Sequence, residues 1–255
     1  MNLRSVYHLS CLLLSLPVTG ICQQGDVSVP LVYEAVRPKY APVIDGKAGA
    51  KEWKDAVWSS AFTDISSANG PAPLYETRIK MMHDDSILYI LAWMKEPHVT
   101  AAMTKHDDLL FKENDFEVFI DPDGDGKNYV EIEINAAGTV MDLKLDKPYS
   151  EGGKADMEWD TPGLLTAVQV DGTLNDDRDT DKGWYAELSV PLSRLLDAGQ
   201  QMKDHSWRIN FLRVDKTSTK NNNELIPHEY YWAWTPQGAV NMHLPSKWGY
   251  LHLTN

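Results

Sequence analysis

The sequence predicts a single antiparallel β-sandwich, immunoglobulin-like or jelly-roll-like, with few short helices. Three observations carry this prediction. Apolar and polar residues alternate in many short segments, and a period of two is typical of a strand with one buried face. Gly, Asp, Asn and Pro separate these segments about every ten to fifteen residues. Segments with a helical period are sparse, and the composition does not change along the chain, so one domain is expected.

The first strands are expected at residues 76–83 and 87–94, which are predicted to form a hairpin around Asp84-Asp85. A second hairpin is predicted within residues 115–142, because Phe116, Val118 and Ile120 are expected to point one way and Glu117, Phe119 and Asp121 the other. Later strands are expected at residues 166–170, 173–174, 184–190, 207–214, 230–234 and 248–253. Short helical turns are expected at residues 50–54 and 192–196, and residues 216–223 are interpreted as a polar loop.

The first 22 residues are typical of a secretory signal peptide. Arg4 supplies the positive region, and the apolar run at residues 9–18 is too short for a membrane span. A cut after Cys22 would leave a mature domain at residues 23–255 that is secreted or periplasmic. A lipid anchor at Cys22 is the less favoured alternative, because Ile21 stands where a lipidation site has a small residue.

Composition excludes several classes of protein. The only cysteines lie in the signal segment, so the mature domain has no disulfide or thiolate metal site. The formal net charge of −13 repels phosphate backbones and anionic lipids, which argues against nucleic-acid and membrane partners. No later stretch is long and apolar enough for a membrane span. Neutral or cationic ligands and metal ions remain as expected partners.

The turn of the second hairpin predicts a calcium site. Asp121, Asp123 and Asp125 alternate along it, and Gly126 follows as in the start of an EF-hand loop. The twelfth position of that motif is Ile132, and strands replace the helices, so we reject an EF-hand. We predict a structural Ca²⁺ bound by the three aspartates and Glu131, since calcium takes about six to eight oxygen ligands. The alternative is a solvated Asp-Gly turn.

The order of the segments resembles the carbohydrate-binding module family 9 domains, within the DOMON-like sandwich group. The matching residues run in order through almost the whole mature chain: 43–46 (Val-Ile-Asp-Gly), 52–53 (Glu-Trp), 121–138, 159–160 (Trp-Asp), 162–164, 172–175, 183–184 (Gly-Trp), 187, 191, 210–214 and 234–238. The resemblance implies an extracellular sandwich that binds sugars, commonly with structural calcium. Such modules often accompany a glycoside hydrolase, so these enzymes are expected partners.

Sugar binding requires flat aromatic rings beside polar groups, and six residues are predicted to supply them. Their positions are Trp159, which is expected in a loop, Trp232 and Trp234 on one strand face, Arg213, and Glu131 with Asn135 on the central hairpin. Each has a structural alternative. The tryptophans are equally suited to core packing, Arg213 to an internal ion pair, and the hairpin residues to a solvated sheet face.

The leading hypothesis is a secreted, non-catalytic carbohydrate-binding protein, and no catalytic residue is predicted. A glycoside hydrolase is the first alternative, with Glu131 and Asp142 as the example of a carboxylate pair. A haem-binding electron-transfer domain is the second. Its axial ligands would come from a set of Met and His residues on predicted strands or near them: Met81, Met82, His83, Met94, Met242 and His243.

Overall fold

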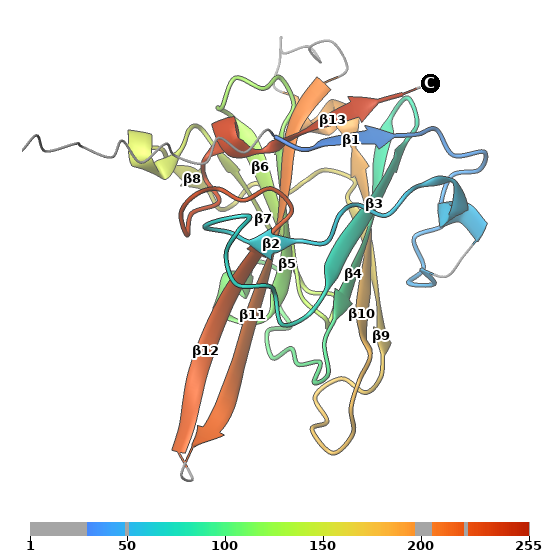
Figure 1. Ribbon diagram of the computed structural model, residues 1–255. Coiled ribbons are helices and arrows are strands. Elements are labelled where there is room, and N and C mark those ends of the chain that lie inside the picture. Colours follow the sequence, from blue (N-terminus) through green and yellow to red (C-terminus); the bar gives the residue numbers. More distant parts are fainter. Residues whose placement is uncertain (1–29, 49–50, 197–205, 222–223, 255) are drawn as a thin grey trace, which may run out of the picture.

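The computed structural model describes residues 30–48, 51–196, 206–221 and 224–254. Within these ranges two β-sheets are stacked face to face, so the predicted all-β sandwich is confirmed (Figure 1). The predicted signal segment at residues 1–22 lies outside the described ranges. No helix within them is long and apolar enough to cross a membrane.

The larger sheet has nine strands. Seven follow one another across it in the order β1 (Val32–Ala35), β13 (Gly249–Leu253), β11 (Ser206–Asn221), β5 (Asp115–Asp121), β6 (Tyr129–Ile134), β7 (Val140–Leu145) and β8 (Ala155–Asp156). The other two branch from it, because β12 (Glu224–Ala233) pairs with β11 and β2 (Thr63–Asp64) pairs with β12. Neighbours are antiparallel except β1 and β13, which are parallel.

The smaller sheet has four antiparallel strands in the order β3 (Thr77–His83), β4 (Ile87–Lys95), β10 (Gly183–Pro191) and β9 (Leu165–Asp171). The predicted hairpin around Asp84-Asp85 is therefore confirmed as β3 and β4. The helical elements are short: η1 (Lys51–Asp55), η2 (Leu110–Lys112), η3 (Tyr149–Glu151), α1 (Leu192–Leu195) and η4 (Pro245–Lys247). The strand expected at residues 173–174 is wrong, because the chain leaves β9 there as a loop.

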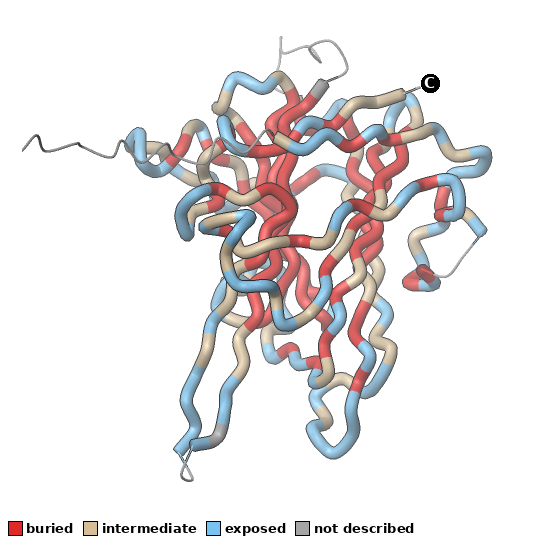
Figure 2. Tube along the Cα trace, in the orientation of Figure 1, coloured by how far each residue is buried: buried red, intermediate tan, exposed pale blue. Residues whose placement is uncertain are grey.

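The main core lies between the sheets. Phe116, Val118 and Ile120 of β5 point into it and are fully buried, as the alternation predicts. Side chains of β3, β4 and β10 face them from the smaller sheet, among them Ile90 and Leu188. Figure 2 shows the buried residues concentrated along the strands of both layers, with exposed residues at the loops.

The outer face of each sheet is also covered in part. A second apolar cluster on the larger sheet includes Phe119, Leu143 and Trp248. A third cluster on the smaller sheet includes Trp53 and Leu91. The outer face of the larger sheet is therefore not the fully solvated face that one interpretation of the sequence allowed, and this difference creates the candidate site described below.

The polar loop predicted at residues 216–223 is wrong. Strand β11 continues to Asn221 and pairs with β12 along its length, from Leu212 opposite Ala233 to Asn221 opposite Glu224. The far half of this hairpin extends beyond the body of the sandwich (Figure 1) and its described side chains are mostly exposed (Figure 2). Polar residues on both faces therefore reflect a hairpin surrounded by solvent.

Candidate functional site

The outer face of the larger sheet holds a cavity of about 440 Å³, which we call the sheet-face pocket. Its floor is built from four adjacent strands. Leu212, Glu117, Glu133 and Met141 are paired across β11, β5, β6 and β7, and the next row is formed by Phe119, Glu131 and Leu143. Directly paired residues of an antiparallel sheet point to the same face. The pairing therefore brings three glutamates together among apolar side chains.

The walls come from loops that surround this floor. Leu109 and Phe111 flank the start of η2, Tyr149 begins η3, Met157 follows β8, and residues 240–243 precede η4. Phe111 and Tyr149 are 42% and 48% exposed, so their rings are open to solvent at the rim. The Tyr149 and His243 rings contact edge to face, with centroids 4.6 Å apart. The pocket thus combines an acidic floor with an aromatic rim.

Hydrogen bonds from the sheet fix the walls. The Asn210 amide donates to the Thr235 carbonyl at 2.9 Å, and its oxygen accepts the Thr235 N–H at 3.0 Å. The Trp248 indole donates to the Met242 carbonyl at 2.8 Å. The Glu133 carboxylate accepts the Phe111 N–H at 2.9 Å, which ties the floor to the rim.

The acidic floor is electrostatically unusual, because its carboxylates are buried beside one another. Burial raises the pKa of Glu117 well above its ordinary range, and the nearby Asp115 charge raises it further. Burial likewise raises the pKa of Glu133 well above its usual range, and that of Glu131 to about 7. Burial lowers the pKa of His243 to about 4, so its imidazole is neutral at pH 7. The site therefore offers buried carboxyl groups that accept hydrogen bonds, and that also donate them when protonated, and it lacks a positive histidine.

The acidic turn between β5 and β6 forms a separate group. Carboxylate oxygens of Asp121, Asp123 and Asp125 lie within 4.8 Å of one another, and Gly124 and Gly126 adopt the left-handed backbone conformation that the turn requires. Burial raises the pKa of Asp121 to about 7, although its oxygens accept the N–H groups of both glycines. These hard oxygen donors fit Ca²⁺. The fourth predicted ligand, Glu131, lies in the sheet-face pocket instead.

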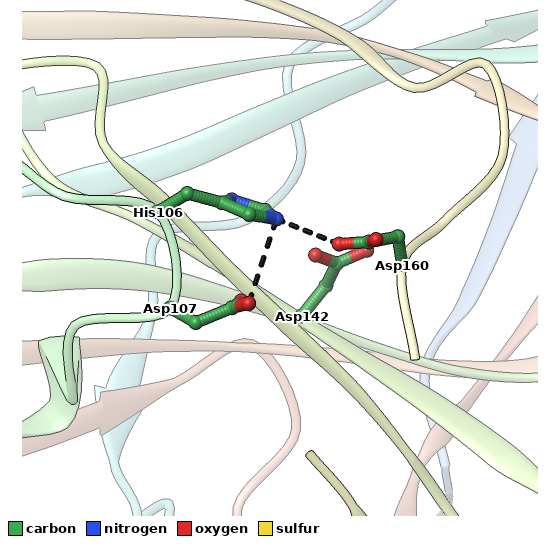
Figure 3. A group of neighbouring side chains, drawn as sticks. All are labelled: His106, Asp107, Asp142 and Asp160. Carbon is green, nitrogen blue, oxygen red and sulfur yellow. Dashed lines mark hydrogen bonds and ion pairs between the residues drawn. The ribbon is translucent and has the colours of Figure 1, made fainter. Parts of the chain in front are cut away.

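A third acidic group lies at the edge of the larger sheet, and Figure 3 shows its four side chains converging. The His106 imidazole contacts Asp160 at 2.7 Å and Asp107 at 3.6 Å through Nε2, while Nδ1 lies 3.0 Å from the Val140 carbonyl. The Asp142 carboxylate lies beside them and accepts the Thr161 N–H. These residues come from segments far apart in the chain, so their proximity was not predicted from the sequence.

The remaining sugar-site predictions are spread through the molecule. Trp232 and Trp234 are 2% exposed and pack in the core between the sheets. Trp159 is half-buried against the edge of the same core, with the Lys144 ammonium 5.9 Å from its ring centroid. None of the three rings lines the sheet-face pocket.

The two polar predictions away from the pocket make structural contacts. The Arg213 guanidinium is buried and forms ion pairs with Asp215 at 2.6 Å and Glu96 at 3.3 Å, which confirms the internal ion-pair alternative. Asn135 is fully buried and closes the turn between β6 and β7. Its amide donates to Met103 and Glu113, and its oxygen accepts N–H groups from Ala137 and Thr139. Of the six predicted sugar contacts, only Glu131 lies in the pocket.

The carboxylate pair named for glycoside hydrolysis does not face a common space. Asp142 is paired with Ile132, whose side chain points into the core, whereas Glu131 points to the outer face. The Met and His residues named for haem are also dispersed. Met81 and Met94 fill the main core, Met82 packs on the outer face of the smaller sheet, and both nitrogens of His83 contact backbone carbonyls.

Glu117 was not predicted as a site residue. Glu133 was predicted to share one face with Glu131 and Asn135, where a ligand, a calcium ion and solvent were the alternatives. Their signal is present in the alternation of β5 and β6, which places both on the same side as Glu131. The rim residues Phe111 and Tyr149 carry no comparable signal, because they lie in the single helical turns η2 and η3, whose positions depend on the tertiary fold.

Comparisons with known proteins agree on the fold. Residues 44–255 match the family model described as carbohydrate family 9 binding domain-like. Among curated proteins, none matches the chain. A candidate carbohydrate-binding protein from Bacteroides uniformis ATCC 8492 has a similar structure, with a TM-score of 0.66 at 17% identity over 88% of this chain and 98% of its own.

Two structures of a family 9 carbohydrate-binding module from Caldicellulosiruptor kristjanssonii are also similar. The complex with cellotriose has a TM-score of 0.57 at 16% identity, over 88% of this chain and 94% of its own. The complex with glucose has a TM-score of 0.56 at 16% identity, over 87% and 96%. At this level of sequence identity, the similarity shows that the chains share a fold.

Proposed function

The chain belongs to the carbohydrate family 9 binding domain-like family, and from this premise we propose that it is a secreted, non-catalytic protein that binds a carbohydrate in the sheet-face pocket. The observation that carries the proposal is the combination of three buried glutamates on the floor with exposed aromatic rings on the rim.

The chemistry of this pocket matches that of a sugar. A pyranose ring has apolar C–H faces that pack on aromatic rings, and hydroxyl groups that donate hydrogen bonds around its edge. Phe111 and Tyr149 supply the rings, and Glu117 and Glu131 supply acceptors below them. A cavity of about 440 Å³ is within the usual size range of small-molecule pockets.

The fold neighbours suggest which sugars to test first. The Caldicellulosiruptor kristjanssonii module was solved with cellotriose and with glucose. We therefore propose glucose-based oligosaccharides as the first class of ligand. A role in polysaccharide breakdown beside glycoside hydrolases, after export by the signal at residues 1–22, completes the proposal.

The proposal includes a structural Ca²⁺ at the acidic turn, held by Asp121, Asp123 and Asp125. It is supported by the convergence of their oxygens and by the raised pKa of the buried Asp121. When bound, the ion would neutralise the turn and cross-link it. Calcium should raise the melting temperature of the wild type, and Asp123→Asn should reduce this shift. Asp177→Asn, which changes an exposed aspartate in another loop, is the control. If calcium raised the melting temperature of Asp123→Asn as much as that of the wild type, the turn would not be the calcium site.

Sugar binding is tested by titration calorimetry of the mature domain with glucose, cellotriose and a wider oligosaccharide panel. Tyr149→Ala should weaken the affinity about tenfold, because one stacking surface is lost. Tyr40→Ala removes a 70% exposed ring outside the pocket and should leave the affinity unchanged. No binding by the wild type across the panel, or equal affinities for both variants, would contradict the proposal.

A further inference from the structure

The strongest unexplained feature of the molecule lies beneath the sheet-face pocket. Asp115 and Glu117 are two residues apart on the outer face of β5, and Glu133 is directly opposite Glu117 on β6. Carboxylate oxygens of these three residues lie within 4.8 Å of one another. All three side chains are buried, at 0%, 4% and 1% exposure.

Asp115 distinguishes this group from an ordinary cluster of acidic residues. No hydrogen-bond donor reaches either oxygen of its carboxylate from the part of the chain that the structure describes. A buried carboxylate without a partner is strongly unfavourable, because it has lost its hydration and gained nothing in return. The Asp115 carboxylate therefore needs either a bound cation or a proton beside it.

The protein supplies no cation for this role among the described residues. Lys216 is the positive side chain whose charge lowers the pKa of Asp115, but its ammonium is paired with Glu229 at 2.8 Å. Arg213 lies on the opposite face of β11, where it is paired with Asp215 and Glu96. The other charged group beside the cluster is Glu131, which adds a further negative charge.

We propose that a hard divalent cation, Ca²⁺ in the first place, binds under the sheet-face pocket and is coordinated by Asp115, Glu117 and Glu133. The donor set is entirely carboxylate oxygen, without the imidazole or thiolate donors that favour zinc or copper. This site is distinct from the acidic turn, whose three aspartates form a separate group. It does not depend on sugar binding.

A contact between this ion and a bound sugar rests on the proposed function. Glu117 and Glu133 line the pocket, so an ion between them is reached from the cavity side. Calcium takes about six to eight ligands, and three carboxylates leave positions for water or for two neighbouring sugar hydroxyls. The ion would then contact the sugar directly, and chelation would weaken sugar binding.

The competing explanation is a proton shared between Asp115 and Glu133. Burial raises the pKa of both carboxyls well above the ordinary range, and two adjacent carboxyls can hold one proton between them. A metal site binds added calcium, whereas a pair that shares a proton does not, so one experiment separates the two explanations.

The test is calcium titration of chelator-treated mature protein by calorimetry, without sugar, together with a thermal-shift measurement. Asp115→Asn keeps the shape of the side chain and removes its charge. We expect it to bind one ion fewer per chain than the wild type and to lose part of the calcium-induced rise in melting temperature. Asp123→Asn alters only the acidic turn and should retain binding at the pocket floor.

Glu133→Gln is a second floor variant, and Mn²⁺ soaked into crystals gives a direct readout by anomalous scattering. Manganese density between Asp115, Glu117 and Glu133 supports the proposal. Equal calcium stoichiometry in wild type and Asp115→Asn would overturn it, and so would a wild type that binds no ion at millimolar calcium, which indicates a shared proton. Because no sugar is present, these outcomes are independent of whether the pocket binds carbohydrate.

Discussion

Glu117 of β5 and Glu133 of β6 are direct cross-strand neighbours, and both carboxylates are buried on the same face of the larger sheet. Like charges in directly opposed positions destabilise an antiparallel pair. Retaining such a pair under a pocket costs stability, which is common at functional sites. The pair therefore marks the centre of the candidate site more clearly than any tryptophan does.

Replacing one member of this pair should stabilise the metal-free protein. We expect Glu117→Gln to raise the free energy of unfolding by roughly 0.5–1 kcal/mol at pH 7.5 in the presence of a chelator, because Gln avoids the cost of either burying a charge or taking up a proton at a carboxyl whose pKa is raised. Urea denaturation measures the change. Glu158→Gln, at an exposed position, should have no effect. A destabilised Glu117→Gln would show that this carboxylate has a favourable partner in the metal-free protein.

The buried ion pairs of Arg213 should respond in the opposite way. Arg213→Met would leave Glu96 and Asp215 buried without their counter-charge, and we expect a loss of about 3–5 kcal/mol in the free energy of unfolding. Arg178→Met is the matched control, because the Arg178 side chain is 89% exposed in its pair with Asp176. That variant should lose less than about 0.5 kcal/mol. Similar losses in the two variants would contradict the structural role of Arg213.

The His106 pair should give a measurable titration. The contact with Asp160 raises the pKa of His106, so the imidazolium is favoured in the folded state. The pair stabilises the protein fully below the ordinary histidine pKa of about 6.5, and this contribution is lost as the pH rises through the higher native pKa. NMR titration should place the ring above about 6.5 in the wild type and lower in Asp160→Asn.

Both groups of this pair are largely exposed, so its contribution to stability is small. His106→Gln should cost less than about 1 kcal/mol at pH 5.5, and the cost should be smaller at pH 9, where the ring is neutral and the ion pair is absent. His243 provides the internal reference in the same spectra. Burial lowers its pKa to about 4, so its ring stays neutral over most of the titration. A measured His106 pKa at or below the ordinary value would show that His106 does not pair with Asp160.

The projecting β11–β12 hairpin should be dispensable for folding. Thr219 and Ile226 are paired and both have a backbone N–H, so residues 220–225 can be replaced by an Asn-Gly turn that suits a two-residue connection. The removed residues bury little apolar surface, as their exposed described positions indicate. We expect the melting temperature to change by less than about 2 °C. A much larger fall in circular-dichroism melting would show that the hairpin tip stabilises the sandwich.

The sequence predicted the strands in which one face is more apolar than the other. The strands of both predicted hairpins follow from alternation, because the face between the sheets is largely apolar, although β5 and β6 are buried on both faces. The β11–β12 extension was missed for the same physical reason. Its far half has solvent on both sides, so residues 216–223 show no apolar face to reveal a strand.

The site was predictable only in part. Alternation placed Glu131 and Glu133 on one face, but which face lies under a pocket depends on how the walls fold over it. The spacing of Trp232 and Trp234 was correctly interpreted as one face, and that face packs in the core. The rim residues Phe111 and Tyr149 come from single helical turns far apart in the chain, and local sequence does not encode their meeting.

The way the pocket wall is anchored has a consequence for variation among relatives. The side chains of Asn210 and Trp248 form hydrogen bonds with the loop that follows β12. These bonds go to the backbone atoms of Thr235 and Met242 and not to the side chains of the loop. Because any amino acid offers the same backbone groups, the exposed side chains of Ala239 and Val240 can be exchanged while the anchors persist, whereas Met242 is buried in the second apolar cluster. Val240 lines the pocket, so a substitution there would change the shape and polarity of the pocket wall while the sheet beneath it stays the same.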